Sequence, residues 1–235
     1  MIFKKSKDNI FNKNLGKSQR YTGFTLAEVL ITLGIIGVVA ALTIPSLVNN
    51  FQNEEYIVAL KKNYSELTNA YKQIIYDSGS ISNALGPAGT FNHDRPITMF
   101  SSYLNTTKVC YMSAASAGKC FHTAELSNLD GNDSMWNFAS FGGIILANGS
   151  MLTFFDNAST CENSKTCGWF LIDTNGFKPP NRYGKDIYRF YYGTNGIYTL
   201  RQTGTTAPCQ HGNPSADNGL GCADLIISGT LPSDW

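Results

Sequence analysis

The sequence predicts an α+β protein in which a long N-terminal transmembrane helix continues into an ectodomain and packs on an antiparallel β-sheet. Three observations predict this class: an apolar segment near the N-terminus, a helical stripe of apolar residues after it, and two hairpin patterns in the second half of the chain. We expect five parts: a basic N-terminal segment over 1–23, a membrane-spanning segment over 24–48, an amphipathic helix over 49–79, a globular ectodomain over 80–202 and a variable, cysteine-containing region over 203–235.

The apolar segment from Phe24 to Val48 contains one formal charge, on Glu28. At about 1.5 Å per residue, a helix of this length crosses a hydrocarbon core of about 30 Å. A charge near the middle of a bilayer costs about 2.5–3.5 kcal/mol on insertion scales, so Glu28 needs a partner or a purpose. The residues before Gly23 are strongly basic, and a basic flank stays in the cytoplasm. We therefore expect a single-pass protein of the cytoplasmic (inner) membrane with residues 49–235 outside the cytoplasm.

The segment Gly23-Phe24-Thr25-Leu26-Ala27-Glu28 resembles the N-terminal signature of type IV pilins and type II secretion pseudopilins, the prepilin class III signal. The resemblance implies that residues 1–23 are a leader, which prepilin peptidase removes between Gly23 and Phe24. Phe24 would then be the N-methylated mature terminus, with its amino group four residues from Glu28. Pro45 matches a recurrent proline at which a pilin helix can bend or loosen. The alternative is an uncleaved signal anchor in which Glu28 is incidental.

The amphipathic helix is predicted from apolar residues spaced by three and four, which form one stripe on a helix surface. The stripe consists of Ile57, Leu60, Tyr64, Leu67, Tyr71 and Ile74. Residues 80–140 are rich in Ser, Asn, Gly and Ala, and we expect short helices or loops there.

Two hairpins and a strand between them are predicted from residue 142 onward. The first hairpin turns at Asn148-Gly149, a strong turn signal. A third strand covers 168–173, and a second hairpin pairs 186–192 with 197–201. Within the C-terminal region, only 223–227 resembles a regular element, for which we expect an edge strand. In pilins the sheet packs on the C-terminal half of the long helix, so the order of elements agrees with the resemblance.

All six cysteines follow the apolar segment, and an even count outside the cytoplasm favours disulfides. Six cysteines permit 15 pairings, so the connectivity stays open. Proximity along the chain favours Cys110–Cys120, Cys161–Cys167 and Cys209–Cys222. A zinc site is the rival use, but the sequence has no Cys-x-x-Cys pair.

A possible metal site follows the third strand, where Asp173, Asn175 and Asp186 bracket a glycine- and proline-containing loop. Oxygen ligands spaced by one residue and followed by a glycine turn suit a hard cation such as calcium, and some pseudopilins bind calcium in a loop between strands. The alternative is that Asp173 and Asn175 form a turn by bonding to local backbone groups. Calcium is the one cofactor the sequence suggests.

No catalytic motif is present, and His93, His122 and His211 are expected to be surface residues of polar loops. The net charge of +1 gives no reason to expect nucleic-acid binding. The resemblance implies a structural subunit rather than an enzyme. Its partners would be prepilin peptidase, other pilin or pseudopilin subunits bound through the N-terminal helix, and an inner-membrane assembly platform.

Two further functions stay open. One is a minor pilin at a filament tip, whose ectodomain binds a surface, DNA or a secreted substrate. The other is a membrane-anchored enzyme. Sequence features do not distinguish a type IV pilus from a type II secretion pseudopilus or a DNA-uptake apparatus.

Overall fold

The computed structural model describes residues 23–86, 92–123, 126–132, 141–156, 161 and 165–231. The chain divides into two compact units, Met1–Val48 and Asn49–Trp235. The division falls at the residue where the apolar segment of the sequence ends.

The first unit consists, in its described part, of a short segment without regular secondary structure and the beginning of helix α1 (Leu26–Ser78). Its large apolar side chains are exposed, with Leu42 at 76% of its full accessibility. Within the described ranges, α1 is the helix long and apolar enough to cross a membrane. The helix continues through Pro45, whose missing N–H leaves the carbonyl of Ala41 without its usual helical partner.

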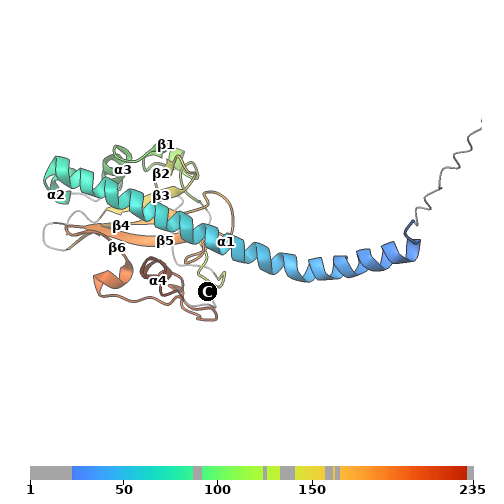
Figure 1. Ribbon diagram of the computed structural model, residues 1–235. Helices are drawn as coiled ribbons and strands as arrows, with labels where there is room; N and C mark the ends of the chain where they lie inside the picture. Colours follow the sequence, from blue (N-terminus) through green and yellow to red (C-terminus); the bar gives the residue numbers. More distant parts are fainter. Residues whose placement is uncertain are drawn as a thin grey trace, which may run out of the picture. The chain divides into compact units, whose positions relative to one another are not determined.

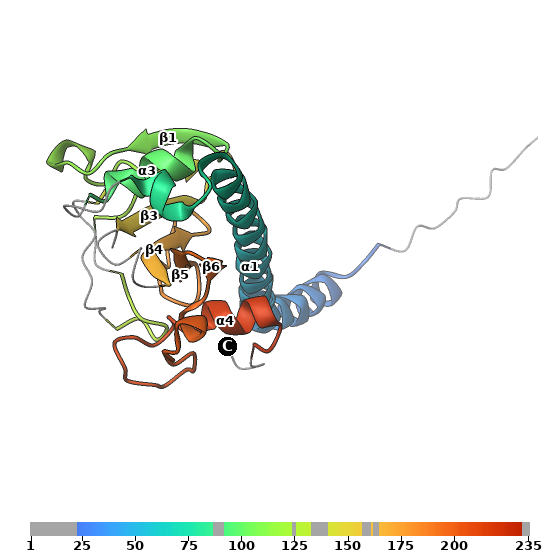
Figure 2. The same cartoon turned by 90° about the vertical axis from the view of Figure 1, so that its left-hand side faces the viewer.

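The second unit contains a six-stranded sheet in which each strand pairs antiparallel with the next one in the chain (Figure 1). The strands are β1 (Thr106–Cys110), β2 (Gly143–Leu146), β3 (Met151–Asp156), β4 (Thr166–Asp173), β5 (Ile187–Gly193) and β6 (Gly196–Tyr198). The part of α1 that belongs to the second unit lies along one face of this sheet, as Figure 2 shows from the side. The predicted α+β class, with a long helix packed on an antiparallel sheet, is confirmed.

The larger of two buried apolar clusters lies between α1 and the facing side of the sheet. Leu60, Leu67 and Ile74 of α1 are fully buried there, as the apolar stripe predicted. Opposite them, Phe154, Phe170 and Phe190 are direct neighbours across β3, β4 and β5. Residues that pair directly across neighbouring strands point to the same face of the sheet, so all three rings lie on one face. The burial of these apolar side chains is the dominant favourable term in the folding of such a domain.

Polar contacts fix the helix on the sheet at defined points. The Tyr71 hydroxyl donates to the carbonyl of Gly193 at 2.7 Å. Asn63 is fully buried, donates to Ser150 Oγ at 2.8 Å and accepts from Asn148 Nδ2 at 2.7 Å. Asn148 and Ser150 flank the turn between β2 and β3, so this group joins α1 to the hairpin that the sequence predicted.

The expected edge strand over 223–227 is wrong, because this segment forms helix α4 (Cys222–Ser228). Cys222 and Ile226, four residues apart, are buried on one face of it. Gly229 follows with φ 74°, the left-handed conformation that commonly ends a helix. The periodicity of a short apolar run does not distinguish a strand from a helix. The spacing of four residues between Cys222 and Ile226, and a glycine just after the run at Gly229, indicate a helix.

Several smaller elements complete the second unit. They are α2 (Ile81–Leu85), α3 (Asp94–Ser101), and the 3₁₀ turns η1 (Ala114–Ser116) and η3 (Leu200–Thr203). The second hairpin is shorter than predicted, because β6 ends at Tyr198 and η3 takes the place of its last residues. Strand β1 was not predicted as a strand. It is an edge strand with Thr107 and Lys108 exposed, so it lacks the alternation of apolar residues that identifies the other strands.

Candidate processing and assembly site

Glu28 lies in the first turn of α1, and Thr25 caps that turn. The amide of Glu28 donates to Thr25 Oγ1 at 3.2 Å, while Glu28 Oε2 accepts from the amide of Thr25 at 2.8 Å and from its hydroxyl at 2.9 Å. This reciprocal arrangement is a capping box, which satisfies amide groups that the start of a helix leaves without partners. Glu28 therefore has a local partner in the uncleaved chain.

From the sequence, the partner expected for Glu28 was the Phe24 amino group that cleavage would release, four residues away in the same subunit or on a neighbour. The Thr-x-x-Glu spacing of Thr25 and Glu28 immediately before an apolar run was the available indication of a capping box. The side chains of Thr32 and Thr43 also bond within the helix. Thr32 and Thr43 donate to carbonyls one turn earlier, at 2.8 Å and 2.9 Å.

Gly23 and Phe24 precede α1 in a segment without regular secondary structure. A Cβ atom added to Gly23 would meet no other atom within 4 Å, so packing within the chain does not require glycine here. Phe24 is 87% exposed. The bond between these residues is thus accessible in the described part of the chain.

A family model described as the prokaryotic N-terminal methylation motif matches residues 18–44. The chain carries the type IV pilin and pseudopilin signature. The motif supports a type IV pilin-like or pseudopilin precursor, and the N-terminal apolar helix is consistent with anchoring in the inner membrane. The motif implies processing by prepilin peptidase and assembly with other pilins. No curated protein and no solved structure matches the chain.

A buried pair of titratable side chains lies in the second unit of the chain. His122 Nε2 is 2.6 Å from Asp173 Oδ2, and Asp173 is fully buried at the end of β4. Burial raises the pKa of Asp173 to about 7, although the hydrogen bond with His122 acts in the opposite direction. The expectation that His122 is a surface residue is wrong, since only 6% of it is exposed. The pair ties the segment after Cys120 to the sheet.

The three residues considered for calcium are held by hydrogen bonds of their own. Asp173 Oδ1 accepts from the amide of Asn175 at 3.0 Å, which is the turn that the alternative interpretation expects. Asp186 accepts from the amides of Asn181 at 2.8 Å and Arg182 at 2.7 Å. Burial raises the pKa of Asp186.

Other features of this loop bear on the calcium interpretation. Asn175 Oδ1 and Asn181 Oδ1 are buried and accept no hydrogen bond from any described residue. Among the described residues, no group of three or more His, Cys, Asp or Glu side chains converges as a metal site would need. The calcium site stays a prediction.

The six cysteines form three disulfides, Cys110–Cys120, Cys161–Cys167 and Cys209–Cys222. These are the pairs that proximity along the chain favoured. Each bond closes a short loop, and the last one fixes α4 to the chain segment before it.

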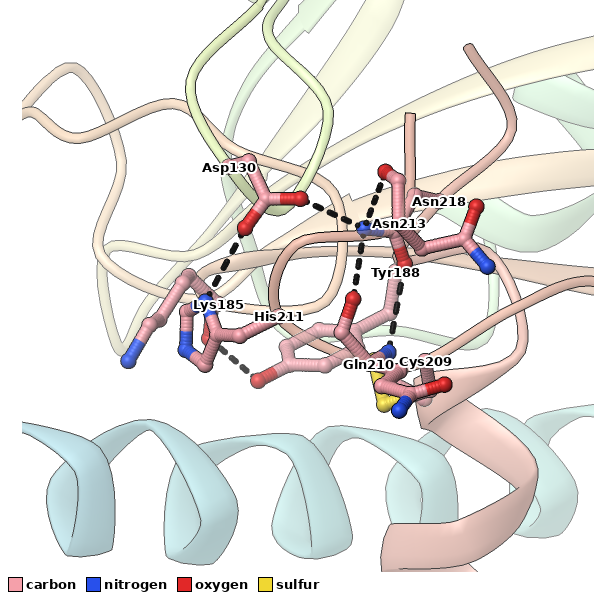
Figure 3. The surroundings of a disulfide bond; sticks show 9 residues. Asp130, Lys185, Tyr188, Cys209, Gln210, His211, Asn213 and Asn218 are labelled. Carbon is pink, nitrogen blue, oxygen red and sulfur yellow. Dashed lines mark hydrogen bonds and ion pairs between the residues drawn. A yellow bond between two sulfur atoms is a disulfide. The ribbon is translucent and has the colours of Figure 1, made fainter. Parts of the chain in front are cut away.

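The loop closed by Cys209 and Cys222 is organised by Asn218, which is fully buried (Figure 3). Its Nδ2 donates to Asp130 Oδ2 at 2.9 Å and to the carbonyls of Gln210 and Asn213. Asp130 also accepts from the amide of Gly212 at 3.0 Å and lies 3.1 Å from the Nδ1 of His211. The Gly212 amide and His211 lower the pKa of Asp130. The C-terminal region is thus docked on the 126–132 segment.

The remaining histidine, His93, is half-buried, and its surroundings also differ from those of a surface residue. Its Nδ1 accepts from the amide of Asp156 at 3.0 Å, and its ring lies 4.3 Å from that of Phe155. Burial lowers the pKa of His93. Hydrogen bonding and ring stacking give His93 a structural part at the end of β3.

Proposed function

We propose that this chain is a structural subunit of a type IV pilus or a type II secretion pseudopilus. It is inserted in the cytoplasmic membrane, cleaved after Gly23, methylated on Phe24 and incorporated into a helical filament. The observation that carries the proposal is the methylation motif, which coincides with an exposed apolar helix that has one carboxylate in its first turn.

The capping box supports a specific role for Glu28. In the precursor, Thr25 supplies the hydrogen bonds that keep the carboxylate at the start of the helix. Cleavage after Gly23 creates a charged amine on Phe24, the residue next to Thr25. An ammonium group is a stronger partner for a carboxylate than a neutral amide, because charge-assisted hydrogen bonds are about twice as strong as neutral ones.

Pairing of Glu28 with the Phe24 amine of a neighbouring subunit would set the axial position of each subunit in the filament. A buried charge is tolerable where it is matched, and a subunit in the wrong position would leave it unpaired at a cost of about 3–5 kcal/mol. The apolar side chains exposed along the first unit supply the surface through which helices bundle in the filament core. Prepilin peptidase, sister subunits and an assembly platform are the partners that this role requires.

The test is a Glu28→Ala variant expressed in the native host. We expect normal membrane insertion and cleavage, because neither requires the carboxylate, together with a loss of protein from sheared filaments. Glu66→Ala, which removes an exposed carboxylate from the ectodomain part of α1, serves as the matched control and should assemble normally. Normal incorporation of the Glu28→Ala variant would refute the proposed role of Glu28.

A further inference from the structure

A cavity of about 410 Å³ lies beside the last turns of α1, where that helix meets α2 and α3. The residues that line it include Ile74 and Ser78 of α1, Leu85 of α2, and Arg95 and Met99 of α3. Its volume is in the range of about 300–1,000 Å³ that is typical of small-molecule sites. None of its described lining residues belongs to the cleavage site, the calcium prediction or a disulfide, so the features described so far do not account for it.

The guanidinium group of Arg95 has no partner in this cavity. Its Nη1 atom is buried and forms no hydrogen bond with any described residue. Arg95 also takes part in none of the ion pairs among the described residues, although Asp94 is its neighbour in the sequence. A buried charged donor without an acceptor is unfavourable, because it has lost its contact with water and gained no hydrogen bond in return. An acceptor on a bound ligand would remove this cost.

Two further donors in the wall of the cavity are also unengaged. The hydroxyl of Ser78 and the Nδ2 atom of Asn92 make no hydrogen bond with the described residues. In contrast, Asn92 Oδ1 already accepts from the amide of Asp94 at 3.0 Å, and Asp94 Oδ1 accepts from the amide of Met112 at 2.6 Å. Free donors beside a cation fit a ligand group that only accepts hydrogen bonds, which is the character of an ionised carboxylate or phosphate.

We propose that this cavity binds a carboxylate that carries a short apolar body, with the carboxylate paired to Arg95. The planar fork of a guanidinium matches the two oxygens of a carboxylate, so two parallel hydrogen bonds form. Two sources share this chemistry, a free organic acid and the C-terminal residue of a polypeptide. The inference goes beyond the proposed function and does not depend on it.

The charge of the site favours a carboxylate over a phosphate. Arg95 supplies one positive charge, and Asp94 adds a negative charge to the same wall. A phosphate monoester carries a charge of about −1.5 to −2 at pH 7, so its excess negative charge would lie near Asp94 without a partner. A carboxylate carries one negative charge, which a single guanidinium balances.

The rest of the wall explains why the ligand carries an apolar body. Ile74, Leu85 and Met99 contribute apolar side chains to the cavity, and each of them is buried in the fold. Contact with these side chains removes apolar ligand surface from water, which is favourable in proportion to the area removed. An inorganic anion would leave this part of the cavity unused.

The experiment measures ligand binding to the full-length protein in neutral detergent micelles by saturation-transfer NMR. The probes are pentanoate, pentanamide, which has the same shape without the charge, and inorganic phosphate. We expect pentanoate to bind with a dissociation constant of about 1 mM or lower, and the other two probes to bind at least about tenfold more weakly.

Two arginine variants separate the site from the background of the micelle. Arg95→Gln should weaken the binding of pentanoate by about tenfold or more, because it removes the charge and the fork. Arg201→Gln is the matched control, since it makes the same change at a side chain that is 69% exposed and does not line the cavity, and it should bind like wild type. In ligand-free protein, Arg95→Gln should leave the urea midpoint unchanged or raised, because the charge that it removes has no partner within the described chain.

A third arm distinguishes the two sources of the carboxylate. An acetylated dipeptide that ends in leucine, with a free C-terminus, is compared with pentanoate and with its own C-terminal amide. Tighter binding of the dipeptide acid assigns the site to the C-terminal residue of a polypeptide, and tighter binding of pentanoate assigns it to a free acid. Equal binding of the acids and their amides, tighter binding of phosphate, or full binding by Arg95→Gln would overturn the inference. A lowered urea midpoint of ligand-free Arg95→Gln would also overturn it, because the guanidinium would then serve the fold.

Discussion

Replacing Asn63 by alanine should destabilise the ectodomain by about 2–4 kcal/mol. Asn63 is fully buried and makes two side-chain hydrogen bonds, to Ser150 and from Asn148. Each such bond has a net value of about 0.5–1.5 kcal/mol. The variant also leaves a small cavity and removes a partner from the buried hydroxyl of Ser150, which adds about 1 kcal/mol or more.

The assay is urea unfolding of the purified protein followed by tryptophan fluorescence, because Trp169 lies on β4 within the sheet. Asn69→Ala is the control, since Asn69 is exposed on the same helix and its loss should change the free energy of unfolding by no more than about 0.5 kcal/mol. Asn63→Leu keeps most of the side-chain volume while it removes the hydrogen bonds, so it should remain destabilising. A change below about 0.5 kcal/mol for Asn63→Ala would refute the reasoning.

Two further predictions concern the polar pair and the C-terminal disulfide. The folded protein holds a proton on Asp173 up to about pH 7, whereas the unfolded chain releases it near pH 4, so folding between these pH values takes up a proton. The resulting contribution to the free energy of unfolding is fully present below about pH 4 and is lost as the pH rises through 7. Asp173→Asn should flatten the dependence of the melting temperature on pH between 5 and 8, and an unchanged slope would contradict the assignment. Replacing both Cys209 and Cys222 by alanine should lower the free energy of unfolding by about 3 kcal/mol, as expected for a disulfide that closes a loop of about 15 residues. An unchanged urea midpoint would contradict that role.

Local patterns in the sequence predicted the long helix and most of the sheet. The spacing of Leu60, Leu67 and Ile74 matches the period of a helix. Asn148-Gly149 favours a tight hairpin turn through its own backbone preferences, largely independent of the neighbouring segments. The same local patterns misassigned α4, because five consecutive residues with an apolar majority carry no periodicity. The turn after β6 was also assigned to a strand. For α4, the deciding residues were Cys222 and Gly229, which lie just outside those five residues.

The polar groups of the fold were mostly beyond prediction. Asn63 occupies a position within the apolar stripe and is compatible with burial only because the turn after β2 supplies its partners. His122 and Asp173 are far apart in the sequence, so no spacing rule connects them. The capping box at Thr25 and Glu28 differs from these pairs. Its spacing is local and can be read from the sequence, whereas the membrane cost of Glu28 indicates only that the carboxylate needs a partner.

The central claim is that the chain is a precursor whose leader is removed before assembly. Its most direct test is the intact mass and N-terminal residue of the protein isolated from the membranes of its native host. The account predicts a chain that begins at Phe24 and carries one additional methyl group. A chain that still begins at Met1, in cells with an active prepilin peptidase, would contradict the claim and leave the protein an anchored ectodomain.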